Sequence, residues 1–129
     1  MVKARTPHRG EIWYFNPDPV AGHELQGPHY CIVVTDKKLN NVLKVAMCCP
    51  ISTGANAARS TGANAARSTG VTVNVLPRDT QTGNLHGVVL CHQLKAVDLI
   101  ARGAKFHTVA DEKLISEVIS KLVNLIDPQ

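Results

Sequence analysis

The pattern of apolar and polar positions predicts strands along most of the chain. Residues 71–76 (VTVNVL) alternate apolar and polar side chains, as expected of a strand with one buried face. Short apolar or aromatic-rich runs predict further strands in four segments, which are 9–16 (RGEIWYFN), 31–35 (CIVVT), 43–51 (LKVAMCCPI) and 87–98 (GVVLCHQLKAVD). Pro50 is expected to end the strand in 43–51, and 87–98 is expected to hold one or two strands.

The pattern changes period near the C-terminus, where apolar residues recur at helical spacing of three and four. Thr108 can cap this helix, with Asp111 three residues on, and Pro128 follows its end. The apolar stripe consists of Leu114, Ile115, Val118, Ile119, Leu122, Val123 and Ile126. Several short strands followed by one packed helix predict a mainly β fold with a C-terminal helix, a small β-barrel closed by that helix, in a single domain spanning 1–129.

The remaining segments predict loops. Residues 17–29 gather Pro and Gly, 36–41 (DKKLNN) are polar, and 77–84 (PRDTQTGN) form a turn. Residues 52–70 contain the unit STGANAAR twice in succession, followed by the start of a third copy. Two units are too few for a solenoid, and their composition predicts a long loop. Doubling a flexible loop costs only about 0.6 kcal/mol of closure entropy, so such a duplication is tolerable.

Composition narrows the classes of protein. The chain has 129 residues, 44% of them hydrophobic, and a formal charge of +4, which permits a polyanionic partner without requiring one. No segment predicts a secretory signal or a membrane span, so we expect a cytoplasmic protein. The four cysteines form no CxxC pair and predict buried, reduced thiols and no metal site: Cys31, Cys48, Cys49 and Cys91.

Three polar groups could carry chemistry in loops that a barrel brings together. The first is residues 22–27 (GHELQG) followed by His29, and the second is Ser52-Thr53, which leads into Arg59 and Arg67. The third is His92-Gln93, expected inside a strand. No group is specific alone, but histidines, hydroxyls and arginines together suit cleavage of RNA by its own 2′-hydroxyl without a metal ion.

Several of these segments resemble the MazF/PemK/Kid family of toxins. The matching stretches are RGEIWYFNPDPVAGHELQG, a strand ending in Pro-Ile-Ser-Thr-Gly with Asn-Ala-Ala-Arg after it, GVVLCHQLKAVDLIARGAK, and the C-terminal helix. The resemblance implies an SH3-like barrel, a homodimer, and cofactor-free, metal-independent cleavage of single-stranded RNA that inhibits translation and growth. Its implied products carry a 2′,3′-cyclic phosphate and a 5′-hydroxyl. An antitoxin is the implied protein partner, and operator DNA would be bound only through the antitoxin complex.

The resemblance also implies roles for individual residues. His23 and Glu24 fall on the family's GHE loop, and Gln26 falls on the polar position that follows. Ser52 stands where relatives carry a Thr that contacts the scissile phosphate, and Thr53 matches the next hydroxyl. Where many relatives have a catalytic or RNA-binding Asp this chain has His92, and Gln93 matches their Gln. Counting from the strand before the repeat favours Ser52-Thr53 over the later Ser-Thr pairs.

His29 is the main departure from the family pattern, since relatives usually carry a catalytic Arg there. His29 can serve as an acid, a base or a protonated cation, but lacks the permanent charge and planar fork of Arg. Three alternatives follow. His29 acts itself, with activity falling above its pKa; or Arg59 or Arg67 reaches in from the repeat; or the protein binds without cutting.

Two other functions remain open. One is a catalytically inactive module that binds RNA or antitoxin. The other is a gyrase poison of the CcdB type, which shares the fold, but that action depends on a C-terminal Trp, and the only Trp here is Trp13. The repeat itself is interpreted as an in-frame duplication in the family's variable loop, either neutral or able to alter RNA access or strand exchange between subunits.

Overall fold

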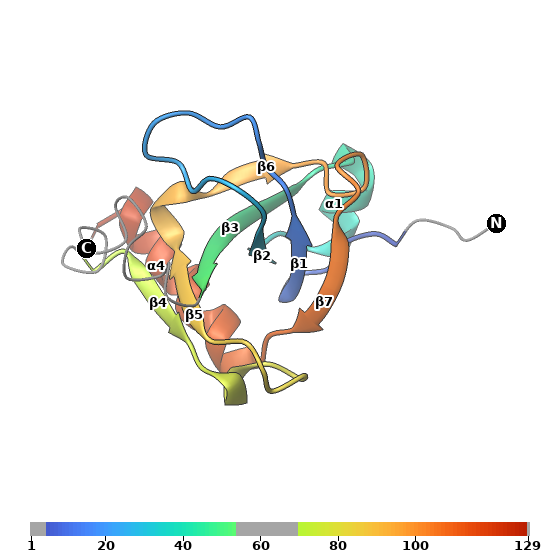
Figure 1. The fold of residues 1–129 in the computed structure, drawn as a ribbon. Helices are drawn as coiled ribbons and strands as arrows, with labels where there is room; N and C mark the ends of the chain where they lie inside the picture. The colour runs from blue at the N-terminus through green and yellow to red at the C-terminus, as the bar shows by residue number, and fades with distance from the viewer. Residues whose placement is uncertain (1–4, 54–69, 129) are drawn as a thin grey trace.

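The computed structural model describes residues 5–53 and 70–128. Within them, strands alternate with short helices, and one long helix ends the chain (Figure 1). In chain order the elements are β1 (Glu11–Phe15), β2 (His29–Val33), α1 (Lys37–Leu43), β3 (Ala46–Thr53), β4 (Thr72–Val75), the 3-10 helix η1 (Pro77–Asp79), β5 (Gly87–Leu90), the 3-10 helix η2 (Cys91–Gln93), β6 (Lys95–Val97), β7 (Lys105–Val109) and α4 (Glu112–Ile126).

All strand pairs are antiparallel, and they form one curled sheet in the order β4-β5-β3-β2-β1-β7. β6 pairs with β3 as well, so β3 is flanked by β2 on one side and by β5 and β6 in succession on the other. A bridge between Thr80 and Ala110 and a 2.7 Å hydrogen bond from the Asp111 N–H to the Asp79 carbonyl join the two ends of the sheet. The strands thus wrap around an interior, as the predicted small barrel requires (Figure 1).

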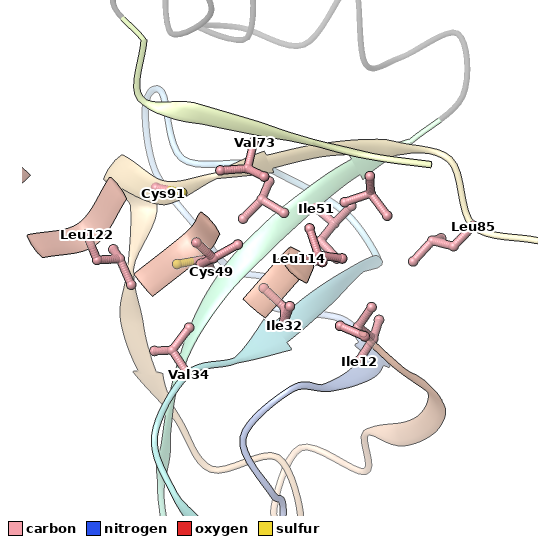
Figure 2. Close-up of a cluster of buried hydrophobic side chains, with 14 residues drawn as sticks. Ile12, Ile32, Val34, Cys49, Ile51, Val73, Leu85, Cys91, Leu114 and Leu122 are labelled. Carbon is pink, nitrogen blue, oxygen red and sulfur yellow. The ribbon is translucent and has the colours of Figure 1, made fainter. Parts of the chain in front are cut away.

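The larger core lies between one face of the sheet and α4. Strand residues such as Ile12, Ile32 and Ile51 pack there against Leu114 and Val118 of the helix (Figure 2). Leu122 continues the same helical stripe one turn on and is also buried, whereas Val123 and Ile126 are exposed. Burial of the Leu114-Val118-Leu122 stripe fixes α4 against the sheet.

The opposite face of the same strands is buried too. Trp13, Cys31 and Cys48 belong to a second core cluster, although their neighbours along each strand, Ile12, Ile32 and Cys49, belong to the first. Side chains alternate between the two faces of a strand, so only a strand covered on both sides buries consecutive residues. This arrangement explains why the apolar runs of β2 and β3 do not alternate with polar residues.

The predicted strands exist, but the limits of β3 differ from those expected. β3 begins at Ala46 and continues past Pro50 to Thr53. On the side of β3 away from β2, the pairing strand is β6 up to Cys48 and β5 from Ile51. Pro50 lies in the gap between these two pairings. A proline without an N–H is tolerated in a strand at such a gap in the ladder. The prediction that Pro50 ends the strand was therefore wrong.

The polar segment 36–41, for which no helix was predicted, is mostly helix α1. The Asp36 side chain caps it by accepting a 3.0 Å hydrogen bond from the Leu39 N–H. Asn40 is buried; its amide donates to the carbonyls of Pro7 and Thr35 and accepts from the Thr35 hydroxyl. The helix is thus stabilised by caps and polar contacts, which apolar periodicity does not reveal.

The C-terminal helix begins later than predicted. Asp111 is the cap, accepting a 2.8 Å hydrogen bond from the Leu114 N–H. Thr108, predicted as the cap, lies in β7, a strand that the pattern of the sequence did not predict. β7 is an edge strand with exposed Lys105 and Phe106, so its sequence lacks a continuous buried face.

The four cysteines are free and buried, as predicted. The pKa of the Cys48 thiol is raised by its hydrogen bond with the Cys31 thiol and by burial, and contact with Cys91 does the same for Cys49. Among the described helices, none is both long and apolar enough to cross a bilayer.

Candidate active site

The loop between β1 and β2 is fastened to η2 by one side chain. The side-chain oxygen of Gln93 accepts a 2.8 Å hydrogen bond from the Leu25 N–H, and its NH2 group donates a 3.0 Å bond to the His23 carbonyl. Gln93 was predicted inside a strand, but it ends the 3-10 helix that separates β5 from β6. The turn of η2 therefore directs Gln93 toward the loop, which arches beside β6 (Figure 1).

Contacts within the same loop fix its shape. The Glu24 carboxylate accepts a 2.9 Å bond from the Ala21 N–H, and the Asp18 carboxylate accepts a 3.2 Å bond from the Gly27 N–H. Gly22 and Gly27 have positive φ values of 61° and 75°, a region that glycine enters without steric cost. These turns return the chain to the sheet at His29.

His29 begins β2 and is 7% exposed. It pairs with Phe15 of β1, and the two rings meet edge to face with centroids 5.3 Å apart. Its Nδ1 lies 2.9 Å from the Gly27 carbonyl, while its Nε2 is buried with no hydrogen-bond partner among the described residues. An unpaired polar atom in such a position costs free energy, and functional sites are where proteins retain one.

Two features determine the protonation of His29. Burial lowers its pKa below the ordinary 6.5; the Gly27 carbonyl and Asp18 oppose that shift, and Lys95 adds to it. The ring is therefore neutral at pH 7. A carbonyl can only accept, so Nδ1 carries the proton and donates, which leaves Nε2 with a free lone pair.

A small pocket of about 230 Å³ joins the loop, β2, β3 and the η2–β6 segment. Its lining residues are Glu24, Leu25, His29, Pro50, His92, Gln93, Leu94 and Lys95. His92 is mostly exposed, and partial burial lowers its pKa below 6.5. The pocket thus brings together four of the residues singled out from the sequence, although they belong to segments about 70 positions apart.

Lys95 was not among the predicted site residues. It is half-buried at the start of β6, two positions after Gln93 in the segment HQLKAVD. The signal available in the sequence was this short spacing, but a lysine at a strand end is normally solvated. Only the fold brings it close enough to His29 to act on its pKa.

Other predicted residues lie outside the pocket lining. His23 and Gln26 are exposed on the loop, where the Gln26 NH2 group donates to the Gly22 carbonyl at 3.3 Å. Ser52 is buried and Thr53 half-buried at the end of β3. Arg59 and Arg67, with most of the duplicated repeat, lie outside the described residues.

Ser52 is nevertheless close to His29 in the sheet. Tyr30 pairs with Ile51, so His29 and Ser52 stand at the next opposed positions, on the face shared by Cys31 and Cys48. β3 also approaches β5 closely here, because Ser52 pairs with Val88 and Thr53 with Gly87. The Ser52 side chain is thus expected on the His29 face of the sheet, whereas Thr53, the next residue, is on the other face.

Other features of the described surface lack these residues. A cavity of about 480 Å³ lies between the N-terminal segment, α1 and the loop after β6, and it contains no residue predicted for the site. Within 5–53 and 70–128, no cluster of three His, Cys, Asp or Glu side chains has an arrangement that could hold a metal ion. The 230 Å³ pocket is therefore the candidate site.

Comparison with known proteins gives a consistent result. A family described as PemK-like, MazF-like toxin of type II toxin-antitoxin system matches residues 8–126. Endoribonuclease PemK of Escherichia coli is 34% identical over 118 residues, which cover 92% of this chain and 80% of that protein. Endoribonuclease toxin ChpB of Escherichia coli (strain K12) is 32% identical over 127 residues, covering 98% and 100%.

Solved structures agree on the fold. MazF from Deinococcus radiodurans superimposes with a TM-score of 0.76 at 24% identity, over 95% of this chain and 98% of that one. A MazE-MazF structure from the same organism gives a TM-score of 0.71 at 22% identity, over 95% and 97%. With the family matching nearly the whole chain, the protein belongs to the PemK-like, MazF-like toxins of type II toxin–antitoxin systems.

Proposed function

We propose that this toxin is an endoribonuclease that cuts single-stranded RNA at short sequences, without a metal ion, and so stops translation and growth. Two relatives that match nearly all of this chain are named endoribonucleases. The observation that carries the proposal is the neutral, unpartnered Nε2 of His29 beside a pocket that also holds His92. Cleavage by the RNA's own 2′-hydroxyl needs a base and an acid of this kind.

His29 is the base in this scheme. Its Nε2 lone pair takes the proton of the 2′-hydroxyl as the 2′ oxygen attacks the adjacent phosphorus. The Nδ1–H bond to the Gly27 carbonyl, 2.9 Å long, orients the ring and stabilises the imidazolium that forms. The alternative in which His29 replaces the charge of the family Arg is less well supported, because burial disfavours the protonated ring.

His92 is the acid that protonates the departing 5′ oxygen. The P–O5′ bond breaks as the 2′ oxygen bonds to phosphorus, so the products are a 2′,3′-cyclic phosphate and a 5′-hydroxyl. Ser52, at the neighbouring strand end on the His29 face, is proposed to donate a hydrogen bond to the phosphate. Thr53, which follows it at the end of β3, remains a proposed RNA contact. Glu24, Gln26 and His23, on the loop that borders the pocket, are proposed to contact the flanking nucleotides.

Gln93 has a different proposed role from the one predicted. Both polar ends of its amide are already bound to the loop backbone. It therefore positions the loop, and RNA contact is secondary. Because the Nε2 of His29 is not exposed to solvent, side chains around it must shift for the substrate to reach it, while the loop supplies a wall of the pocket through Glu24 and Leu25.

The partners follow from the family and its solved relatives. A MazE-MazF structure shares this fold, which supports an antitoxin that binds and restrains this toxin. We propose in addition a homodimer acting in the cytoplasm without a cofactor, with operator DNA contacted only through the antitoxin complex.

The experiment that tests the function is incubation of the purified protein with a long unstructured RNA in EDTA, followed by mapping of cut positions and end groups. We expect reproducible cuts with cyclic-phosphate and 5′-hydroxyl ends. His29→Ala should abolish them, whereas His8→Ala, at the opposite end of β1, should not. Bound but intact RNA would support a binding module instead.

A further inference from the structure

The described lining of the candidate pocket carries few positive charges. Burial keeps His29 and His92 mostly neutral at pH 7, and Glu24 adds a negative charge. Among the lining residues that the structure describes, Lys95 is the only lysine or arginine. A phosphodiester that enters the pocket brings a full negative charge, and among the described lining residues Lys95 is the one that can neutralise it.

The register of β6 directs the Lys95 side chain toward the site. Lys95 pairs with Cys48 of β3, and two residues on Val97 pairs with Ala46. Cys48, Val97 and Ala46 belong to the second core cluster, so Lys95 lies on the same face of the sheet, at the margin of that cluster. His29 shares this face, since it pairs with Phe15 of the same cluster.

Electrostatic contacts agree with that placement. Lys95 adds to the lowering of the His29 pKa and partly opposes the rise of the Cys48 pKa, and these two residues stand on neighbouring strands. Its side chain is half-buried, and charge interactions are stronger there than in open solvent.

No ion pair to Lys95 is found within residues 5–53 and 70–128, although the Glu24 carboxylate lines the same pocket. The ion pair between Arg5 and Glu11 lies on a different part of the sheet. A half-buried lysine without an ion-pair partner, in a pocket with a histidine whose ring nitrogen is unpaired, is a candidate for binding an anionic ligand.

We propose that Lys95 binds the scissile phosphate, supplying the fixed positive charge that an arginine would otherwise provide. This inference rests on the proposed function. The ammonium group donates hydrogen bonds to a non-bridging oxygen while His29 takes the 2′ proton. As the 2′ oxygen attacks, negative charge grows on the phosphorane oxygens, so the contact strengthens in the transition state.

In this role Lys95 acts in the chemical step as well as in the binding of RNA. A ground-state contact alone would raise KM and leave kcat unchanged, whereas a contact that strengthens in the transition state lowers kcat. Loss of one such donor typically costs about 100- to 1,000-fold in kcat. Lys95→Gln should show a loss of that size, and Lys95→Arg should restore part of it.

The first measurement is binding, with cutting prevented. An RNA oligonucleotide containing a mapped cut site, with 2′-deoxyribose at the nucleotide 5′ of that site, cannot undergo 2′-hydroxyl attack. Its affinity is measured against salt for the wild type and for Lys95→Gln. Loss of one phosphate contact should reduce the slope of log K against log salt by about 0.7. Lys113→Gln, on the outer side of α4, should retain the wild-type slope.

The second measurement is single-turnover cleavage of the unmodified oligonucleotide by these three proteins and by Lys95→Arg, with circular dichroism to check the fold. A kcat loss of about 100-fold in Lys95→Gln alone, with partial recovery in Lys95→Arg, supports the proposal. Wild-type cleavage and slope in Lys95→Gln would overturn it and leave the nuclease intact. If the wild type does not cut, the proposed function fails, and an unchanged slope in Lys95→Gln would then overturn the phosphate contact as well. In that case no cut site is mapped, and the salt slope is measured with any unstructured RNA that the wild type binds.

Discussion

The side-chain oxygen of Gln93 accepts a 2.8 Å hydrogen bond from the N–H of Leu25, a residue 68 positions earlier in the chain. The other end of the same amide binds the His23 carbonyl. One side chain thus fixes two adjacent turns of the loop that borders His29. Gln93 thus holds the loop at the site, and elsewhere in the loop the Pro17 carbonyl accepts a hydrogen bond from Arg102 at 3.3 Å.

Replacement of Gln93 by Ala should release this loop. The Leu25 amide loses its acceptor, so its hydrogen exchange should accelerate by at least tenfold, while amides of β2 and β3 stay protected. Cleavage should fall because the pocket loses a wall. Gln93→Glu keeps the acceptor for Leu25 but cannot donate to His23, and should give an intermediate result.

The matched control for that experiment is Gln81→Ala, since Gln81 is exposed in the loop after η1. Exchange at Leu25 should be unchanged in this variant. Equal protection of Leu25 in wild type and Gln93→Ala would show that the loop is held by other contacts.

The pH dependence follows from the histidines. The pKa of His29 and that of His92 both lie below 6.5 because of burial. A base must be neutral and an acid protonated, so kcat/KM should follow a bell with its maximum on the acidic side of pH 6.5. At pH values below this maximum, kcat/KM falls because His29 gains a proton. This reverses the expectation from sequence alone, in which activity declined above the pKa of His29.

Stability should change with pH in the same range. A histidine whose folded pKa is lowered binds fewer protons in the folded than in the unfolded state, so stability declines as pH falls through 6.5 toward the folded pKa. Urea denaturation of wild type and His29→Gln between pH 7.5 and 5 tests this. The variant should lose less stability over that range, and parallel curves would contradict the lowered pKa.

Gly87 controls the strand end that carries Ser52 and Thr53. A Cβ added at Gly87 would overlap the Ser52 carbonyl oxygen and lie 3.0 Å from the Thr53 methyl group. Gly87→Ala should therefore push β5 away from β3 and cost about 3 kcal/mol, at the upper end for overpacking. Gly103→Ala, with a positive φ of 67° but nothing within 4 Å, should cost about 1–2 kcal/mol from strain alone. Urea denaturation compares them; equal losses would argue against the clash.

Glu11, within the family motif RGEIW, has a structural role. Its buried carboxylate pairs with Arg5 and accepts hydrogen bonds from the His8 N–H at 2.9 Å and the Trp13 indole at 3.1 Å. Glu11→Ala leaves the indole without that acceptor and should cost about 1–3 kcal/mol of stability. Exposed Glu117→Ala, on α4, should stay within about 0.5 kcal/mol. Cleavage of RNA at 20 °C by folded Glu11→Ala should be near wild type; a specific loss of kcat would show that the motif acts in the site.

The sequence predicted elements whose stability comes from apolar burial. The C-terminal helix and most strands were found this way, since residues such as Val118 and Ile32 are fully buried. It did not predict α1, which depends on the Asp36 cap and buried Asn40, or β7, an edge strand with exposed side chains. Local polar contacts and sheet edges have little effect on apolar periodicity.

The site was predictable only in part. The family pattern pointed to His29, His92, Glu24 and Gln93, and the fold places all four around one pocket. It could not show that Gln93 is occupied by the loop backbone, or that Lys95 comes close to His29. Both depend on a contact between segments about 70 residues apart, and spacing along the chain does not encode such contacts.

The most direct test of the central claim, that His29 is the base, uses RNA in which sulfur replaces the 5′ oxygen at the mapped cut site. Sulfur leaves without needing a proton, so this substrate rescues variants that lack the acid and not those that lack the base. Single-turnover rates are compared for wild type, His29→Ala and His92→Ala on both substrates. We predict that the His29→Ala defect persists with the sulfur substrate, whereas the His92→Ala defect largely disappears. Recovery of His29→Ala to the wild-type rate would show that His29 is the acid and contradict the account.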